Sequence, residues 1–550
     1  MNKQCVNCHK TFTVSAADLE FYDRVSPVFA GKKYLIPAPT HCPDCRLQRR
    51  LAIRNEKCLY NRTCDLCGKK IISQFPAKTK YKIYCQECWW SDKWMPEQYA
   101  KDFNFQENFF QQYARLLAAV PKANLVNKEP TLDNSDYVNF MTDAKNCYLV
   151  FAANFLENCM YSSYIWESKD TLDCSYSTKL ELCYDCMDCD NLFKCQFLQQ
   201  SRNCHECMIG YGLKNCANCF GCINLNIKKN YFFNKPLSSE QYQQKIQEIL
   251  RDENKFNKAK EQFADFSLKY PRKFAHQINC ENSSGEGIKN CKNCQHCFDG
   301  YDGEDLKWLM NFPGKTKDCY DVSGCAEIEL AYESHCCGLP GYRVLFANMN
   351  ITGAQNLAYC TNCDNCKDCF GCVGIKKVQY AIFNKEYSKK EYEKLAGKII
   401  QHMQKTGEWG EFFPISISPF AYNETVAYEY FPLKKEEVLA RGWKWKDAGE
   451  TSTSRFHPIC SKCGRNFNII PQEKLFYAKQ NIFLPKKCPD CRNQERISLR
   501  NTRSLWKRQC MCTQPDHNHH GRCANEFETT YSPERKELVY CEDCYQKEVY

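Results

Sequence analysis

The sequence CPDCRLQRRLAIRN at residues 42–55 occurs a second time, in altered form, as CPDCRNQERISLRN at residues 488–501. The offset of 446 residues between the copies also relates Cys64 to Cys510, so the repeat is longer than the quoted stretch. Each copy begins with a CxxC pair, and another CxxC pair lies upstream of it. Two such pairs turn four sulfurs toward one point, the tetrahedral arrangement that Zn²⁺ accepts. The repeat therefore predicts a zinc site at each end of the chain.

A second set of four cysteines follows each copy. In both sets a cysteine lies 18 residues before the last CxxC pair, Cys67 in the first set and Cys523 in the second. Cys510 takes the place of Cys64. We therefore expect about four structural zinc ions, held by Cys5, Cys8, Cys42 and Cys45; by Cys64, Cys67, Cys85 and Cys88; by Cys460, Cys463, Cys488 and Cys491; and by Cys510, Cys523, Cys541 and Cys544.

The last set contains an insertion that the first set lacks, MCTQPDHNHHGR at residues 511–522. It brings Cys512, which could replace Cys510 as a ligand, and His517, His519 and His520. A catalytic zinc keeps an open position for water, whereas four cysteines already fill the parent site. We interpret the insertion as a surface loop, with accessory metal binding and a catalytic zinc as alternatives.

The zinc sites are expected to dominate the stability of the ends. Structural zinc contributes an apparent ~10–16 kcal/mol per site, so both ends should unfold without metal. Within the first pair of sites, the segment KKIISQFPAKTKYKIY at residues 69–84 alternates apolar and polar side chains, which predicts a β-hairpin.

The cysteine content bears on the cellular compartment. The 550-residue chain has 43 cysteines, an odd number that excludes complete pairing in disulfides. Its start, MNKQCVNCHK, lacks the apolar core of a signal peptide, and no run of apolar residues is long enough to span a membrane. We therefore predict a cytoplasmic protein whose cysteines bind metal or stay reduced, rather than a secreted disulfide framework.

The motifs at both ends resemble a known family. Residues 5–50, with Phe21-Tyr22 and CPDCR at 42–46, resemble bacterial zinc-ribbon, treble-clef-like domains, whose pattern is CxxC, an FY pair and a proline shortly before CxxCR. Residues 460–492 match through FNIIPQEKLFY and LPKKCPDCR. The whole chain looks like a large, uncharacterised bacterial family with such ribbons at both ends. The resemblance implies zinc binding and says little about role.

Basic residues follow each CPDCR motif at helical spacing, which places them on one face of a helix. Because the planar guanidinium donates two hydrogen bonds to phosphate, this face is a candidate nucleic-acid surface. The alternative is a solvated helix face, or arginines paired with the acidic middle of the chain. The candidate residues are Arg46, Arg50, Arg54 and Lys57 near the start, and Arg492, Arg496, Arg500, Arg503 and Lys507 near the end.

The charge of the chain is unevenly distributed. Residues 1–95 carry a net charge of +9, residues 455–550 carry +6, and the part between them carries −5. Basic ends suggest contact with a polyanion. Each zinc bound by four thiolates would carry −2, however, so four such sites would remove 8 of these positive charges.

The middle of the chain is a cysteine-rich repeat. Six cysteines of residues 140–236 lie on a 12-residue ladder whose gap is filled by Thr171, and further cysteines lie on parallel ladders. Such a period predicts stacked coils of a β-solenoid, with cysteines as small buried groups. Extra zinc sites at 183–189 and 216–222 are the alternative. The ladder consists of Cys147, Cys159, Cys183, Cys195, Cys207 and Cys219.

This block is itself duplicated, because residues 215–235 match residues 365–385 at an offset of 150. The expected fold is mixed α+β and multidomain, with paired zinc ribbons at both termini flanking two cysteine-rich β-solenoid-like lobes and connecting helices. The expected segments are tandem ribbons at 1–95, a helical connector at 96–139, the first lobe at 140–236, a helical arm at 237–273, the second lobe at 274–386, a helix and aromatic strap at 387–454, and tandem ribbons at 455–550.

Catalytic signatures are missing from the sequence. PGKTKD at residues 313–318 lacks the first glycine of a phosphate loop, and HExxH, GxSxG and the Rossmann fingerprint are absent. We therefore predict a non-enzymatic zinc scaffold that binds RNA, DNA or a nucleoprotein particle through its ends and has no membrane partner. A protein–protein interaction scaffold is the alternative; a β-solenoid enzyme and a metal storage or sensing protein are less favoured.

Overall fold

The computed structural model describes residues 1–447, 458–517 and 519–550. Its contacts divide the chain into two compact units. Unit 1 joins residues 1–125 to residues 276–447, and unit 2 joins residues 126–275 to residues 448–550. The boundary expected at 454/455 lies outside the described residues. Each unit thus combines one end of the chain with a distant part of its middle.

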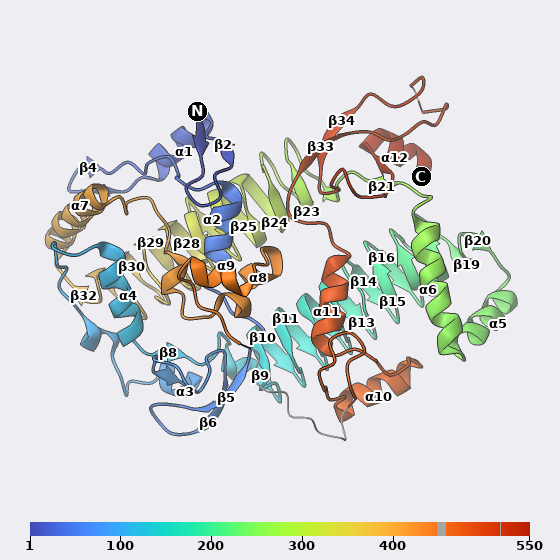
Figure 1. Cartoon of the computed structure of the whole chain (residues 1–550), viewed down its shortest axis with the longest axis horizontal. Coiled ribbons are helices and arrows are strands. Elements are labelled where there is room, and N and C mark those ends of the chain that lie inside the picture. The colour runs from blue at the N-terminus through green and yellow to red at the C-terminus, as the bar shows by residue number, and fades with distance from the viewer. Residues whose placement is uncertain (448–457, 518) are drawn as a thin grey trace. The chain divides into compact units, whose positions relative to one another are not determined.

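Unit 2 is built on a sheet of twelve strands, almost all parallel, seen as a ladder of arrows in Figure 1. Strand β20 alone pairs in antiparallel fashion, with β19. The strands are β9 (Leu132–Asp133), β10 (Val138–Lys145), β11 (Val150–Glu157), β12 (Ser163–Lys169), β13 (Ser175–Glu181), β14 (Asp190–Phe193), β15 (Gln196–Gln199), β16 (Arg202–His205), β17 (Met208–Tyr211), β18 (Ala217–Ile223), β19 (Lys229–Phe232) and β20 (Lys235–Pro236).

The register of this sheet is the 12-residue ladder of the sequence. Val138 pairs with Val150, and Ser163 pairs with Ser175. Within each 12-residue coil the backbone adopts positive φ at every third residue, for example at Asn146, Asn158 and Asp170. A left-handed residue turns the chain, so each coil has four short sides.

Every third residue of this sheet, from 138 to 222, is buried. Each buried residue directly follows a left-handed one, and cysteine fills many of these positions. The thiols are donors: Cys159 Sγ lies 3.4 Å from Glu157 O, and Cys186 Sγ lies 3.5 Å from Tyr184 O. Burial raises the pKa of both thiols well above their ordinary value. The ladder cysteines therefore act as small, protonated core side chains, and no disulfide joins any of the 43 cysteines.

Asparagine before the cysteine has a structural role in this sheet. Asn and Asp tolerate the left-handed conformation better than other residues with a Cβ atom. Their amides also form a ladder from coil to coil: Asn146 Nδ2 donates to Asn158 Oδ1 at 3.1 Å, and Asn158 Nδ2 donates to Asp170 Oδ1 at 2.9 Å. One residue type thus supplies both the turn and the bond to the next coil.

Unit 1 contains a second sheet of this kind, with eleven strands. Its coils have 12 or 13 residues: Gly285 pairs with Cys297, whereas Gly341 pairs with Ala354. These extra residues explain why the cysteine ladder of this part looks irregular in the sequence. The strands are β22 (Gln277–Ile278), β23 (Gly285–Lys289), β24 (Cys297–Lys307), β25 (Met310–Ser323), β26 (Ala326–Glu329), β27 (Tyr332–His335), β28 (Gly338–Leu345), β29 (Ala354–Ala358), β30 (Lys367–Phe370), β31 (Gln379–Ile382) and β32 (Lys385–Glu386).

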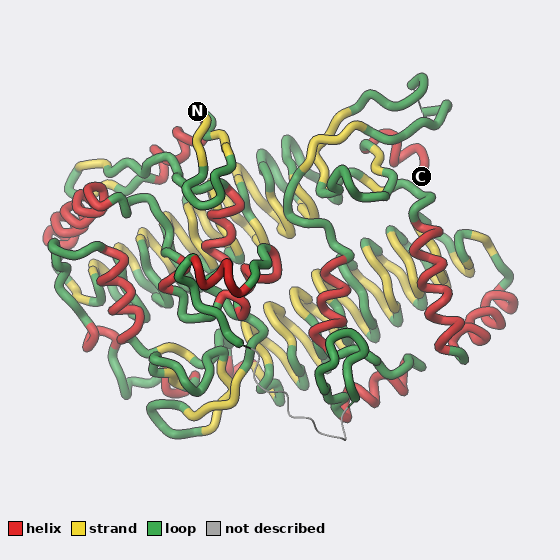
Figure 2. Tube along the Cα trace, in the orientation of Figure 1, coloured by secondary structure: helices red, strands yellow, loops and turns green. Residues whose placement is uncertain are grey.

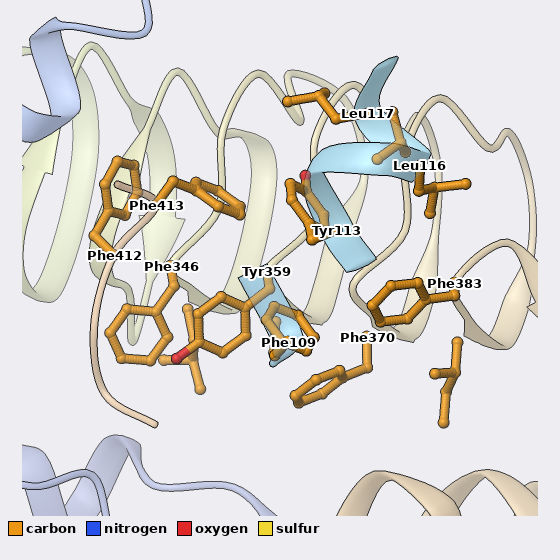
Figure 3. Packing of buried hydrophobic residues seen from close by; sticks show 14 of the residues in the cluster. Phe109, Tyr113, Leu116, Leu117, Phe346, Tyr359, Phe370, Phe383, Phe412 and Phe413 are labelled. Carbon is orange, nitrogen blue, oxygen red and sulfur yellow. The ribbon is translucent and has the colours of Figure 1, made fainter. Parts of the chain in front are cut away.

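Helices cover this second sheet. Helix α4 (Phe109–Ala119) places Phe109 and Tyr113 against Tyr359 and Phe370 of the sheet, as Figure 3 shows. The Tyr113 hydroxyl donates to Thr361 Oγ1 at 2.7 Å. The other helices of unit 1 that follow the sheet are α7 (Lys389–Thr406), α8 (Val426–Tyr430), α9 (Lys435–Ala440), and the 3-10 turns η3 (Ile415–Ile417) and η4 (Tyr422–Glu424).

The helical arm expected at 237–273 is two helices rather than one. Helix α5 (Ser239–Leu250) ends at Arg251, and α6 (Glu253–Ser267) begins with Asp252 as its N-cap. Both pack on the sheet of unit 2, with Phe256 buried against it. This segment is therefore part of the core of unit 2, and not a free connector.

Short elements surround the cysteine knuckles (Figure 2). At the start these are β1 (Asn2–Gln4), β2 (Thr11–Thr13), α1 (Ala16–Val25), β3 (Val28–Phe29), β4 (Lys32–Lys33), α2 (Pro43–Leu51), β5 (Tyr60–Thr63), β6 (Lys70–Ser73), β7 (Ile83–Tyr84), α3 (Gln86–Trp89), η1 (Pro96–Tyr99), β8 (Lys122–Ala123) and η2 (Glu129–Thr131). Near the end they are α10 (Pro471–Gln480), α11 (Pro489–Ser498), β33 (Trp506–Gln509), β34 (Glu526–Thr529), β35 (Val539–Tyr540) and α12 (Glu542–Val549), with β21 (Arg272–Lys273) beside β35.

The hairpin predicted for residues 69–84 is wrong. Strand β6 pairs with β5, across the first knuckle of that site, and β7 pairs with β8. The apolar alternation was real, but each strand found its partner outside the segment. The knuckle itself is the turn of the β5–β6 hairpin.

Candidate metal centres

The structure brings together the four sets of cysteines expected from the sequence. In each set all four sulfurs lie within 4.8 Å of one another. Four sulfurs at about 2.3 Å from one zinc lie about 3.8 Å apart in a tetrahedron. The Sγ–Sγ distances agree: 3.6 Å for Cys8–Cys42, 3.9 Å for Cys67–Cys85, 3.8 Å for Cys463–Cys488 and 4.0 Å for Cys523–Cys541.

The four groups share one construction. The second CxxC pair starts a helix, and its first cysteine is the N-cap, as Cys42 is for α2 and Cys488 is for α11. The positive end of the helix dipole favours a thiolate there. In three groups the amide of this N-cap cysteine also donates to the first sulfur of the set, at 3.2–3.3 Å; the three donor cysteines are Cys85, Cys488 and Cys541.

Three of the groups favour a thiolate before any metal enters. Burial raises the pKa of Cys5, but backbone amides that donate to its sulfur lower it further, to about 6. The same balance brings the pKa of Cys64 to about 7 and that of Cys460 to about 6. In the fourth group burial prevails and raises the pKa of Cys510 to about 11. The fourth group therefore has a different environment.

Cys512 does not replace Cys510. Cys510 itself lies in the fourth group, whereas Cys512 lies with His517, His519 and Cys544 in a fifth close-set group. Cys544 belongs to both. Among the described residues, no such group includes a cysteine of either sheet, so the alternative of zinc at 183–189 and 216–222 gains no support.

The arginines predicted as a nucleic-acid face lie mostly in the interior. Arg46, Arg50, Arg54, Arg492 and Arg496 are buried, while Lys57, Arg500 and Arg503 are partly exposed and Lys507 is exposed. The helices are also shorter than the spacing predicted. Helix α2 ends at Leu51 and α11 ends at Ser498, so four of the nine basic residues are beyond α11 or α2 at the end of the motif, and a fifth, Arg54, lies beyond α2.

In unit 1 these arginines fasten α2 to the sheet. Asp321 of β25 accepts from Arg46 at 2.9 Å and from Arg50 at 3.1 Å. Glu333 of β27 lies 3.7 Å from Arg50, and Ser323 Oγ accepts from Arg50 Nε at 3.3 Å. Arg46 also stacks over a tryptophan ring of the sheet. The guanidiniums of α2 therefore have carboxylate partners within their own unit.

Unit 2 repeats this arrangement with different residues. Asp173 accepts from Arg492 at 2.7 Å and lies 3.4 Å from Arg496, and Asp185 lies 3.7 Å from Arg496. Ser175 Oγ accepts from Arg496 Nε at 3.3 Å, the distance found for its counterpart in unit 1. One offset of 148 residues relates Asp173 to Asp321, Ser175 to Ser323 and Asp185 to Glu333.

The third position of the stripe differs between the units. Arg500 pairs with Asp188 at 2.9 Å and stacks over Tyr176. Its counterpart Arg54 meets Cys336, which the same offset relates to Asp188, and pairs with Glu56 at 2.6 Å. The remaining basic residues are peripheral: Lys57 pairs with Glu429 at 2.7 Å, and Arg503 donates to the Tyr176 hydroxyl.

The acceptor carboxylates were not found from the sequence. Asp173, Asp185, Asp321 and Glu333 all lie at left-handed positions of the coils. Two of them, 12 residues apart, face each arginine helix. The signal that could have found them is an acid repeated at the coil spacing and again at the offset between the lobes.

Comparison with known proteins adds no name: no protein family, no curated protein and no solved structure matches this chain. No helix among the described residues is long and apolar enough to cross a membrane. The argument for function therefore rests on the sites themselves.

Proposed function

We propose that this protein is a zinc-stabilised, non-enzymatic binding scaffold. The observation that carries this proposal is the four Cys₄ groups, each with sulfur spacing that suits one zinc. The ends are then zinc ribbons of treble-clef-like form, because each group joins a knuckle at a strand to a knuckle at a helix start. The two sheets are then β-solenoids, as their 12- and 13-residue registers support.

Zinc and the arginines act together in this scheme. Each metal fixes the first turn of α2 or α11, and the arginines that follow dock the helix on a solenoid. Without zinc the knuckles lose their fixed spacing, and the buried guanidiniums lose their aim at the carboxylates. Metal binding in the ribbons would therefore control how each end of the chain is held on its unit.

Zinc content tests this part. The full chain, purified without chelator and desalted, is analysed for zinc by elemental analysis and for thiols after denaturation under inert gas. At least four zinc ions and all 43 thiols reduced are expected. Serine at both Cys42 and Cys488 should remove two zinc ions, and the change Cys58→Ser, outside every group, should remove none. Fewer than four zinc ions in the parent chain would overturn the proposal.

For the partner we propose RNA or DNA, bound by lysines rather than by the arginine stripe. Five lysines of the second N-terminal ribbon are exposed, and none of them forms an ion pair within the described part of the chain: Lys69, Lys70, Lys78, Lys80 and Lys82. Phosphate neutralisation by such residues gives affinity that falls steeply with salt. The net charge of +9 in residues 1–95 supports the same surface.

Fluorescence anisotropy with a labelled single-stranded RNA and a DNA duplex, across a salt series, tests the partner. Replacing Lys69, Lys70 and Lys78 by Glu should weaken binding and lower the salt slope by roughly 2–3. The matched control replaces three exposed lysines of α7 by Glu, namely Lys389, Lys390 and Lys394. Equal losses in both variants, or no binding by the parent chain, would favour a protein partner instead.

A further inference from the structure

The insertion at residues 511–522 folds back onto the fourth Cys₄ group. Cys523 N donates to Cys512 O at 2.9 Å, which closes the insertion into a loop. The loop turns Cys512 and His517 inward, where both are buried. His520, in contrast, is exposed. The two inward side chains and His519 meet Cys544 on α12.

The distances within this fifth group suit a metal. Cys512 Sγ lies 3.1 Å from His517 Nδ1, and Cys544 Sγ lies 3.6 Å from His519 Nε2. Sulfur at about 2.3 Å and nitrogen at about 2.0–2.1 Å from one zinc lie about 3.5 Å apart in a tetrahedron. Two thiolates and two imidazoles form a complete ligand set for structural zinc.

The outer partners of both histidines orient their lone pairs into the group. His519 Nδ1 lies 2.9 Å from Gly521 O, and a carbonyl can only accept, so Nδ1 carries the proton and Nε2 is free to bind metal. His517 Nε2 lies 3.7 Å from Glu548 Oε2, while its Nδ1 faces Cys512. Carbonyl and carboxylate partners of this kind are typical behind zinc-bound histidines.

We infer that this ribbon holds a binuclear zinc centre in which the Cys544 thiolate bridges two metal ions. One ion is bound by Cys510, Cys523, Cys541 and Cys544, and the other by Cys512, His517, His519 and Cys544. Sharing one sulfur also lowers the charge of the centre. Two Zn²⁺ with five thiolates and two neutral histidines carry −1, whereas one Zn²⁺ with four thiolates carries −2.

The N-terminal half of the chain supplies the comparison for this inference. Its corresponding ribbon, with Cys64, Cys67, Cys85 and Cys88, lacks the insertion and has no second group beside it. One ribbon of the pair thus holds one zinc and the other holds two. The total for the chain rises from four zinc ions to five.

The experiment measures zinc per chain in the full protein after reconstitution with excess zinc and desalting. The parent chain should hold five zinc ions, the double variant His517→Ala/His519→Ala should hold four, and the control His520→Ala should hold five. Four zinc ions in the parent, five in the double variant, or a loss in His520→Ala would overturn the assignment. Failure of the Cys₄ proposal would appear differently, as a parent total well below four.

A second measurement tests the bridge without any substitution. The chain is reconstituted with ¹¹³Cd²⁺, and its cadmium resonances are recorded by NMR. Two cadmium ions that share the Cys544 sulfur should show scalar coupling to each other, and the remaining resonances should show none. Five resonances without coupling between any two would overturn the bridge.

Discussion

Asp321 should be among the most sensitive positions of unit 1. Its carboxylate is fully buried and accepts from Arg46 at 2.9 Å and from Arg50 at 3.1 Å. The change Asp321→Asn keeps the shape of the side chain but leaves two buried guanidiniums facing Glu333 as their nearest remaining acid on the sheet. Removing one partner of a buried ion pair costs about 3–5 kcal/mol, far more than an exposed pair contributes.

Urea unfolding of the zinc-loaded chain, followed by circular dichroism, measures this effect. With a slope of about 3 kcal/mol per molar urea, the loss lowers one transition midpoint by about 1–1.7 M. The equivalent change in unit 2, Asp173→Asn, should lower the other transition, and the two variants together assign the transitions to the units.

The matched control is the exposed pair of Arg24 with Asp318, a neighbour of Asp321 on β25. Arg24 lies 2.7 Å from that carboxylate but is 52% exposed, so Arg24→Met should cost no more than about 1 kcal/mol. If Asp321→Asn shifts the midpoint no further than Arg24→Met does, the arginines do not fasten α2 to the sheet, and the reasoning fails.

Three further outcomes are expected. A strong chelator should unfold the ribbons while the parallel sheets keep their circular dichroism signal, because the sheets contain none of the close-set cysteine groups among the described residues; simultaneous loss of both signals would contradict this. The change Asn158→Val should destabilise unit 2 by about 2–3 kcal/mol in urea unfolding, because it strains a left-handed residue and removes two ladder hydrogen bonds, whereas Asn158→Gly should cost about half as much; equal costs would argue against backbone strain. Alkylation of the native, zinc-loaded chain at pH 8 should leave Cys186 unmodified, because burial raises its pKa and excludes the reagent, while the partly exposed Cys58 reacts; mass spectrometry of the peptides decides, and rapid modification of Cys186 would show that the coil opens.

Spacing made the metal groups predictable from the sequence. Cysteines close in the chain, such as Cys5 and Cys8, have few ways to meet, and the internal repeat identified Cys510 and Cys523 despite the insertion. The 12-residue register of the first sheet was also visible, because Cys147 and Cys159 recur at that period. The 13-residue coils were not, since one extra residue at a corner changes the spacing without changing the side chains.

The arginines show where sequence reasoning stopped. Arg46 and Arg492 follow the same motif and lie on a helix in both copies, but the sequence does not tell which side of the helix is covered. Their partners, Asp321 and Asp173, are several hundred residues away in the chain. A basic stripe with a distant acidic partner looks the same in the sequence as one that awaits phosphate.

The pairing of chain segments within the units has a consequence for synthesis on the ribosome. Arg50 and Asp321 are separated by 271 residues, and Arg496 and Ser175 by 321 residues. At roughly 5–20 residues per second, α2 emerges on the order of ten seconds to a minute before the strand it docks on. The cysteines of the first ribbon are all translated in that time, so the nascent ribbon can take up its metal early. The arginine stripe then stays uncovered until β25 is made, and the newborn chain carries for that interval a basic surface that the finished protein does not have.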